Sequence, residues 1–392
     1  MGQNRLGDRP LTSYVLLYGL MYAAFGVASP FWPQFFAERG LGSEQLAGLL
    51  ALGTAARLVS GPLAGGLADR LSARRVTLAL CIGLSGSLAL GLLAASDYPT
   101  LLLVSLCHAA ALAPVTTLAD ALATRQGIGS AVRFEYGWVR GAGSAAFVVG
   151  TIVAGQAVSF AGLRSVVVFH SGLLLMAALV ALVFLRGTSA DATAQPASSS
   201  LGGFATLLHI PLFRRLLLVA ALILGSHAMH DAFAVIRWSA AGIGPGLASM
   251  LWSLSVVGEV LVFFLIGPPL LARVGSAWAA AIAGAAATLR WTTMALTSDP
   301  IALALVQPLH GLTFALLHLA CMRLMVQVVP ARLVATGQAL YALGVAAATA
   351  LVTLLAGALY ARFGAAAFFA MASLSAVALP LTPFLRGARS PD

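Results

Sequence analysis

The stretch GTSADATAQPASSSLGG, residues 187–203, separates two long apolar regions of the chain. Its serine, alanine and proline content is typical of a flexible linker. The sequence on either side contains repeated apolar runs instead. We therefore predict an N-terminal helical bundle over residues 1–186, a linker over 187–210 and a C-terminal helical bundle over 211–392.

The composition of the two apolar regions excludes most classes of soluble protein. Of the 392 residues, 60% are hydrophobic and only 9% are charged, and the mean hydropathy is +0.97. A water-soluble domain has about 25% charged residues. A soluble enzyme, a disordered chain and a collagen-like repeat are therefore excluded, and a membrane protein is predicted.

The apolar runs are long enough to cross a bilayer, which takes about 20 residues for a helix. Twelve spans are predicted, six in each bundle. The fold class is therefore an all-α membrane protein of twelve transmembrane helices in two six-helix halves. The predicted spans are 12–37, 44–68, 74–95, 99–125, 135–160, 164–185, 213–239, 246–270, 276–297, 300–327, 333–358 and 363–385.

The distribution of arginine predicts the orientation. The formal net charge of +10 would indicate nucleic-acid binding in a soluble protein, but in a membrane protein it reflects the excess of basic residues in cytoplasmic loops. With the N-terminus inside, most loop arginines lie on the inner face, and the outer loops hold only Arg39, Arg164 and Arg362. We expect a multi-pass protein of the bacterial inner membrane with both termini and the linker in the cytoplasm, and no nucleic-acid partner.

The two predicted halves show weak internal symmetry. The loop after the second span runs from Gly65 to Arg75, and the loop after the eighth runs from Gly267 to Gly275. Each is a short inner-face turn with glycine and arginine. Related halves of this kind place a substrate site between them near the middle of the membrane.

Many ionisable side chains fall inside the predicted spans. Such a residue costs about 2.5–3.5 kcal/mol at the helix centre on insertion scales, so it normally faces a cavity or a partner. The set indicates a wet central cavity. Its members are Arg57, His108, Asp120, Arg140, His170, His227, His230, Asp231, Arg237, Glu259, Arg290, His310, His318 and Arg323.

Three of these residues lie at similar depth near the middle of the membrane and form a candidate proton-coupling group. We predict Glu259 as the acid that gains and loses a proton, Arg290 as its switchable counter-charge and His310 as a hydrogen-bonding relay. An alternative for His310 is an ordinary interhelical hydrogen bond. Asp231 could be a second protonation site.

Two further residues match in depth on neighbouring spans. Asp120 and Arg140 each lie about 7–8 Å from the inner end of their helix at a rise of ~1.5 Å per residue. They could form a structural salt bridge or contact substrate. Arg57 is a candidate anchor for an anion, since a guanidinium binds a carboxylate with two hydrogen bonds, or it could contact a neighbouring helix.

The seventh span carries His227, His230 and Asp231 at spacings that share one helix face. A His, His and Asp group could bind a metal. We favour the interpretation that these three side chains line a wet cavity, since no other acid or cysteine is evident at that depth. We therefore predict no metal site.

Several strings in chain order carry a family resemblance. The loop with Asp69, Arg70 and Arg74 resembles the signature between the second and third helices of the major facilitator superfamily, with Ser72 where glycine is usual. Seven further strings resemble the 3-phenylpropionic acid permease group, which is related to lactose permease and to nucleoside:proton symporters. They are PFWP (30–33), TLADALA (117–123), EYGWVRGAGS (135–144), SHA (226–228), LWSLSVVGEV (251–260), LRW (289–291) and LHGLTF (309–314).

The resemblance implies roles for several residues. It implies a conformational latch at Asp69 and Arg70, and it favours a substrate contact at Arg140. With Arg57, Asp120 and Arg140, the candidate substrate-binding residues are His227, Tyr22 and Trp252. The sequence departs from the family at Ala142, His230 and Asp231, and span ten lacks the acid that lactose permease relatives place there.

The resemblance and the buried charges together predict a secondary active transporter. We expect proton-coupled symport of a small organic, aromatic carboxylate by alternating access. A proton-driven exporter of a hydrophobic drug or metabolite, and a sugar or nucleoside:proton symporter, remain alternatives, as does a membrane sensor that transports nothing. No nucleotide-binding loop or catalytic constellation is found, so the protein is not expected to be an enzyme. We expect a monomer whose partners are substrate, protons and lipid, with the proton gradient in place of a cofactor.

Overall fold

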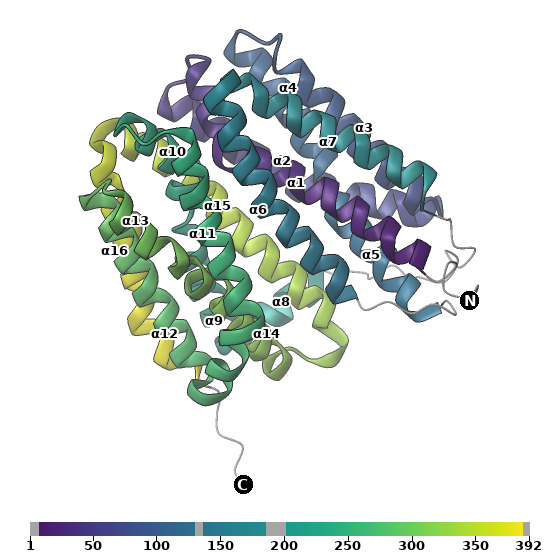
Figure 1. Ribbon diagram of the computed structural model, residues 1–392. Coiled ribbons are helices and arrows are strands. Elements are labelled where there is room, and N and C mark those ends of the chain that lie inside the picture. Colours follow the sequence, from purple (N-terminus) through teal and green to yellow (C-terminus); the bar gives the residue numbers. More distant parts are fainter. Residues whose placement is uncertain (1–7, 130–135, 186–200, 387–392) are drawn as a thin grey trace, which may run out of the picture. The chain divides into compact units, whose positions relative to one another are not determined.

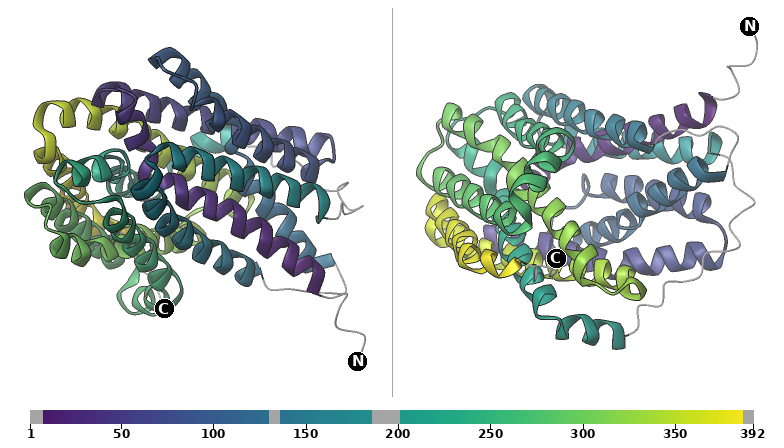
Figure 2. Two further views of the ribbon diagram at one scale, coloured as in Figure 1. Left: turned by 45° about the horizontal axis from the view of Figure 1, so that its top comes forward. Right: turned by 90° about the horizontal axis from the view of Figure 1, so that it is seen from below.

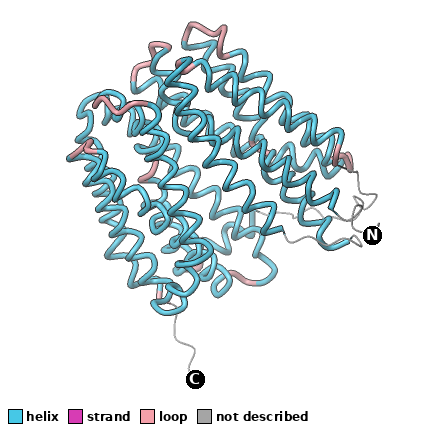
Figure 3. The backbone as a smooth tube through the Cα atoms, in the orientation of Figure 1, coloured by secondary structure: helices cyan, strands magenta, loops and turns pink. Residues whose placement is uncertain are grey.

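The computed structural model describes residues 8–129, 136–185 and 201–386, and every regular element in those ranges is helical (Figure 3). The chain divides into two compact units. Unit 1 comprises Met1–Leu41, Leu52–Pro196 and Gly244–Met250, and unit 2 comprises Gly42–Ala51, Ala197–Ile243 and Leu251–Asp392. The boundary falls in the predicted linker, except that each unit takes one short segment from the other predicted bundle.

Unit 1 is built mainly from the first seven helices. They are α1 (Asp8–Glu38), α2 (Ser43–Arg70, from Leu52 onward), α3 (Arg74–Gly91), α4 (Tyr98–Leu112), α5 (Val115–Gly129), α6 (Tyr136–Ala161) and α7 (Arg164–Val183). Helix α1 lies alongside α6 and α7, and α3 lies alongside α7 and α4 (Figures 1 and 2). The predicted fourth span is divided at Pro114, because proline cannot donate the helical N–H bond.

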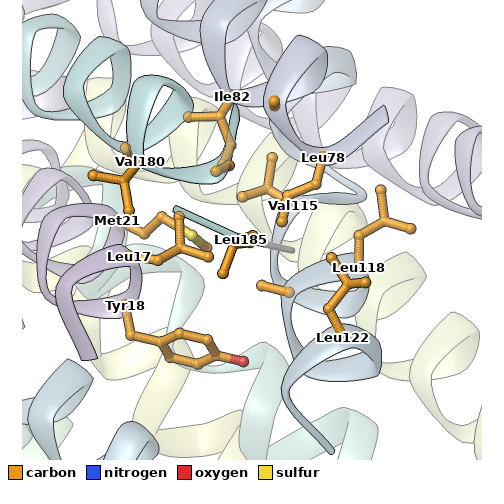
Figure 4. Close-up of a cluster of buried hydrophobic side chains, with 14 of the residues drawn as sticks. Leu17, Tyr18, Met21, Leu78, Ile82, Val115, Leu118, Leu122, Val180 and Leu185 are labelled. Atoms are coloured by element: carbon orange, nitrogen blue, oxygen red, sulfur yellow. The ribbon is translucent and has the colours of Figure 1, made fainter. Parts of the chain in front are cut away.

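The core of unit 1 is a cluster of buried apolar side chains from six of these helices, part of which is drawn in Figure 4. Leu17 and Met21 of α1 face Ile82 of α3, Leu118 of α5 and Val180 of α7 within that cluster. All five side chains are nearly inaccessible to solvent. The cluster therefore fixes the helices that carry the polar residues of unit 1.

Small residues allow α1 and α6 to approach backbone to backbone. A Cβ atom at Gly26 would overlap the carbonyl oxygen of Phe147, and one at Gly150 would overlap the carbonyl oxygen of Ala23. The hydroxyl of Thr151 donates to the Gly26 carbonyl at 3.0 Å. Glycine is needed at these two positions because any side chain would push the helices apart.

Unit 2 contains the remaining helices. They are α8 (Leu201–His209), α9 (Pro211–Gly225), α10 (Ala228–Ala240), α11 (Pro245–Leu261, from Leu251 onward), α12 (Gly267–Leu296), α13 (Pro300–Val306), α14 (Leu317–Val328), α15 (Val334–Phe363) and α16 (Phe368–Ala378). Helix α12 packs against α16, α14 and α9. Helix α8 occupies Leu201–His209, the described part of the predicted linker; residues 187–200 of that linker lie outside the described ranges.

Two spans of unit 2 contain π-helical segments, η2 (Val262–Ile266) after α11 and η4 (Gly311–Leu316) before α14. A short 3-10 turn, η3 (Gln307–Leu309), precedes η4 and contains Pro308. Segments of π-helix are rare and frequently occur at functional sites. Both segments lie next to residues predicted for the site, Glu259 and His310.

Nine helical stretches among the described residues are long and apolar enough to cross a membrane. Two of them, Pro245–Leu296 with 52 residues and Ala331–Leu385 with 55 residues, exceed one crossing. Each contains a glycine with positive φ, Gly275 at 75° and Gly364 at 54°, which divides it into two. The predicted all-helical class is confirmed for the described chain, while the count of twelve spans stays a prediction.

Candidate functional site

Arg290, near the end of α12, is the centre of the largest buried polar network described in unit 2. Its side chain is fully buried, at 0% exposure. Its Nη2 donates to Oε1 of Gln307 at 2.7 Å, to the Ser255 hydroxyl at 3.3 Å and to Nε2 of His230 at 3.4 Å, and its Nη1 donates to Nδ1 of His310 at 3.1 Å. The guanidinium also lies 4.6 Å from the centre of the Trp291 ring.

All of the hydrogen-bond partners of Arg290 are neutral acceptors. Among the described residues, no carboxylate lies within ion-pair distance of the guanidinium. A buried cation without a direct counter-ion is stable only when its hydrogen bonds are satisfied by other groups. The Oε1 of Gln307 that accepts from Arg290 also accepts from the Ser255 hydroxyl at 2.8 Å, while Nε of Arg290 is buried without a hydrogen-bond partner among the described residues.

The contacts of Arg290 assign the tautomers of two histidines, because a guanidinium only donates. Nδ1 of His310 must accept from Arg290, so its proton sits on Nε2, which lies 3.5 Å from Oε2 of Glu259. Nε2 of His230 must also accept, so its proton sits on Nδ1, which lies 3.2 Å from Oδ1 of Asp231. The cation therefore sits between two histidines of opposite tautomer, each facing a carboxylate.

This arrangement links two carboxylates to one cation. The predicted group of Glu259, Arg290 and His310 is brought together, but His310 stands between the acid and the arginine. Asp231 joins the same network through His230. A change in the protonation of either carboxylate alters the hydrogen bond of its histidine, and through that histidine it alters the position favoured by Arg290.

Close backbone packing places Glu259 beside His310. A Cβ atom at Gly311 would overlap the backbone of Gly258, and one at Gly258 would overlap the carbonyl of Pro308. The two glycines are the sequence neighbours of His310 and Glu259. Their lack of side chains therefore lets the eighth and tenth predicted spans approach until the imidazole reaches the carboxylate.

The carboxylate ends of the network are accessible and its centre is not. The exposed fraction of the side chain is 59% for Asp231, 28% for Glu259 and 20% for His310. Asp231 is exposed although the residues on either side of it in α10, from Met229 to Phe233, are buried. Of the charged groups in the network, the two acids are therefore partly exposed and Arg290 is enclosed.

His227 and Trp252 flank this network. The Thr313 hydroxyl lies 2.9 Å from Nε2 of His227, whose Nδ1 donates to the Ile223 carbonyl at 3.0 Å. The predicted seventh span breaks between α9 and α10 at His227, which frees these local carbonyls. Trp252 stacks on His230 with ring centres 4.8 Å apart and is largely buried. Both lie close enough to respond to a change in the network.

In unit 1, the partners of Asp120 are two tyrosine hydroxyls and not the arginine of the salt bridge considered above. Its Oδ1 accepts from the phenol hydroxyls of Tyr18 and Tyr136, the latter at 2.7 Å. The expected pair with Arg140 is not formed: among the described residues, no ion pair joins the two. Arg140 instead lies 4.7 Å from the centre of the Tyr22 ring, and its Nη1 is buried without a hydrogen-bond partner in the described chain.

Arg57 of α2 is exposed, and no acidic side chain of the described residues pairs with it. The considered contact with Asp120 is not made. Arg57 and Arg140 are therefore two cations of unit 1 that have no carboxylate partner in the described structure.

The predicted latch loop is held within unit 1. Asp69 accepts from Nε of Arg74 at 2.5 Å, while Arg70 is exposed. Ser72 adopts φ 48°, and it is the one residue other than glycine with positive φ in the described ranges. The conformation explains why glycine is usual there. Arg75 also donates to the carbonyl of Leu185 at 2.6 Å, which ties the loop to the end of α7.

Several polar residues that contact the predicted site residues in the two units were not predicted from sequence. They are Gln307, Ser255, Thr313 and Tyr136. Gln307 directly precedes a proline inside a span, which is a signal of irregular backbone, but serine and threonine are too common in membrane helices to stand out. Among the described residues, no three His, Cys, Asp or Glu side chains converge as metal ligands would.

Comparisons with known proteins match nearly the whole chain. A model described as the MFS_1 like family matches residues 11–371. The "probable 3-phenylpropionic acid transporter" of Escherichia coli (strain K12) is 30% identical over 370 residues, which cover 93% of this chain and 95% of that protein.

Solved structures share the fold at lower identity. The crystal structure of the nucleoside transporter NupG gives a TM-score of 0.83 at 17% identity, over 95% of this chain and 98% of that one. A crystal structure of a mutant of the peptide transporter POT gives 0.73 at 14% identity, over 96% and 93%. At these identities the likeness concerns the fold alone.

Proposed function

Because the chain belongs to the MFS_1 like family and is an integral membrane transporter of the major facilitator superfamily, we propose that it carries a small aromatic carboxylate together with protons by alternating access. The network around Arg290 is the observation that supports this proposal. It joins one buried cation to two partly exposed carboxylates through histidines of assigned tautomer.

The proton-coupling residues we propose are Glu259, Arg290, His310 and Asp231. Protonation of Glu259 removes the negative charge that His310 faces. The hydrogen bond between His310 and Arg290 is then free to rearrange, which offers the transporter two states that differ in protonation. A conformational change needs such a difference in free energy between its two states.

The cations of unit 1 support an anionic substrate. Arg57 and Arg140 have no acid partner in the described structure, and an arginine binds a carboxylate with paired hydrogen bonds. Tyr22, stacked on Tyr18 with ring centres 5.8 Å apart, offers an aromatic surface beside Arg140. The name of the relative from E. coli refers to a compound of this class, an aromatic ring with a carboxylate.

We propose roles for the remaining predicted residues on the same basis. Asp120, His227 and Trp252 contribute to the substrate site, and Asp69 with Arg70 forms a conformational latch. The partners are substrate, protons and lipid, and the protein acts as a monomer.

We also propose the topology that the sequence predicts. The nine apolar stretches give twelve spans when the two long ones are divided at Gly275 and Gly364 and α3, with 18 residues, is added. Six spans before the linker and six after it would put both termini and the linker on one side of the membrane, and we propose that this is the cytoplasmic side of the inner membrane. The excess of arginine in the inner loops supports this orientation.

Uptake into proteoliposomes tests the proposal. Purified protein with labelled 3-phenylpropionate is expected to accumulate the label when the interior is made alkaline relative to the outside, and not without the gradient. Glu259→Gln is expected to abolish gradient-driven accumulation. Glu38→Gln, at an exposed acid at the end of α1, is the matched control. Accumulation that ignores the gradient, or efflux in its place, would contradict symport.

A further inference from the structure

Unit 1 buries two histidines that the proposed coupling group does not use. His108 of α4 and His170 of α7 are 4% and 1% exposed. Their ring centres are 5.3 Å apart, and the Trp32 ring of α1 packs against both, at 5.5 and 5.1 Å. We call these two residues the histidine pair.

Both rings have the same tautomer. Nδ1 of His108 lies 3.0 Å from the Ser85 carbonyl oxygen, and Nδ1 of His170 lies 2.8 Å from the Ala24 carbonyl oxygen. A carbonyl only accepts, so each Nδ1 carries the proton and donates it. The lone pair of each ring is therefore on Nε2, and a proton can add there without breaking the bond that holds the ring.

The second ring nitrogen of His170 is left without a partner. Nε2 of His170 is buried and has no hydrogen-bond partner among the described residues. A buried polar atom without a partner is unusual and calls for a water, a ligand or a functional explanation. In unit 2, by contrast, a guanidinium donates to the nitrogen that carries the lone pair of His230 and of His310.

One cation acts on both rings. Arg57 of α2 interacts electrostatically with His108 and with His170. The other helices packed around the pair supply a tryptophan, a serine and backbone carbonyls rather than charged groups. The charge on Arg57 disfavours a second positive charge on either ring.

We propose that the histidine pair is a second proton site, in unit 1, which takes up a proton when an anion binds to Arg57. The proposal rests on the function given above, in which Arg57 binds the carboxylate of the substrate. A bound carboxylate neutralises the guanidinium, and Nε2 of one ring then gains a proton from water. When the anion leaves, that N–H bond breaks and the proton returns to solvent.

Proton release and uptake by the purified protein test this directly. Unbuffered protein in detergent with a pH-indicator dye is expected to take up about one proton per 3-phenylpropionate bound, with binding measured separately by calorimetry. His170→Gln combined with His108→Gln is expected to bind the anion and lose that uptake. His209→Gln, at an exposed histidine of α8, is the matched control and is expected to retain it. Uptake that persists in the histidine variant would overturn the proposal while leaving the proposed function intact.

A second measurement needs neither a bound substrate nor a folded double variant. The chain has seven histidines, so ring 15N signals can be assigned with single variants. The wild type is expected to show the pair neutral at pH 7 with the proton on Nδ1. Arg57→Gln, without any ligand, is expected to shift the titration of the pair by about one pH unit or more toward alkaline pH. Signals that do not change in Arg57→Gln would overturn the proposal, even if the protein binds no anion.

Discussion

The two units bury histidines next to tryptophan in different ways. In unit 2, Arg290 donates directly to a nitrogen of His230 and of His310, so the cation and the imidazoles form one hydrogen-bonded network. In unit 1, His108 and His170 bond backbone carbonyls, and Nε2 of His170 has no hydrogen-bond partner among the described residues. Arg57 makes no hydrogen bond to either ring in the described structure. The comparison teaches that the position of the nearest cation, rather than the residue type, sets what a buried histidine can do.

Replacing the two cations is the strongest test of this difference. Arg290→Gln removes the buried guanidinium together with the four hydrogen bonds that it donates. A hydrogen bond to a charged group contributes about 1.5–3 kcal/mol. Gradient-driven uptake is expected to fall by about 100-fold or more, since each 1.4 kcal/mol is a factor of ten. Arg57→Gln is expected to cost about tenfold, mainly in the substrate concentration needed for half-maximal uptake.

Lysine at each position provides the control. Arg290→Lys keeps the charge but cannot reach all four acceptors, so it should remain severely impaired, whereas Arg57→Lys should recover most uptake. Equal losses at the two sites, in protein that elutes as a single species on gel filtration, would contradict the proposed contrast.

Substitutions at two closely packed glycines distinguish an effect on stability from an effect on proton coupling. Gly311→Ala in unit 2 and Gly150→Ala in unit 1 each force a methyl group against backbone, and overpacking costs about 1–3 kcal/mol. Both should lower the thermal midpoint. Only Gly311→Ala is expected also to weaken the coupling of uptake to the gradient, because it moves His310 away from Glu259. Gly172→Ala, where no atom lies within 4 Å, should be neutral in both measurements.

Substitutions in the turns after the second and eighth predicted spans should have smaller effects on stability, and the two effects should have opposite signs. Ser72 has φ 48° and Gly275 has φ 75° with ψ 169°. Ser72→Gly should stabilise the protein by about 1 kcal/mol, because left-handed backbone strains a residue with a side chain. Gly275→Ser should destabilise it by about 2 kcal/mol, since that region of φ and ψ is essentially restricted to glycine. Thermal unfolding of the two variants measures both values, and a destabilised Ser72→Gly would show that the serine hydroxyl matters more than the strain.

The smallest effect is expected at a helix cap outside the membrane. Asp97 precedes α4, and the backbone N–H and hydroxyl of Thr100 donate to its carboxylate, which lowers its pKa below the ordinary value. Its contribution to stability is therefore complete above about pH 4, the unfolded pKa, and is lost as pH falls through the lower folded pKa.

The thermal midpoint measured between about pH 5 and pH 3 should fall slightly in the wild type, and less so in Asp97→Asn, which caps without titrating. Asp299 of unit 2 caps α13 through the N–H of Ala302 at 2.9 Å but has no hydroxyl donor there. Asp299→Asn keeps an oxygen that can accept the same N–H bond, so it should leave the thermal midpoint at pH 7 unchanged.

Much of the fold and part of the site could be predicted from the sequence. Apolar runs identified the spans because a bilayer requires about 20 apolar residues whatever the neighbours are. The depth of Glu259, Arg290 and His310 indicated one group for the same reason, since rise per residue is fixed. The pairing of Asp120 was not predictable, because similar depth does not reveal which helix face meets which, and Tyr18 and Tyr136 reach it before Arg140 does.

The sequence by itself determined that the chain is helical, membrane-embedded and related to known transporters, because these depend on composition and on short strings of residues. Only the tertiary structure decided which nitrogen of each histidine holds a proton and which cation stands beside it. Those choices depend on hydrogen bonds between residues far apart in sequence, such as the bond from Arg290 to His230. Such bonds form only where helices pack to within about 3 Å of each other's side chains.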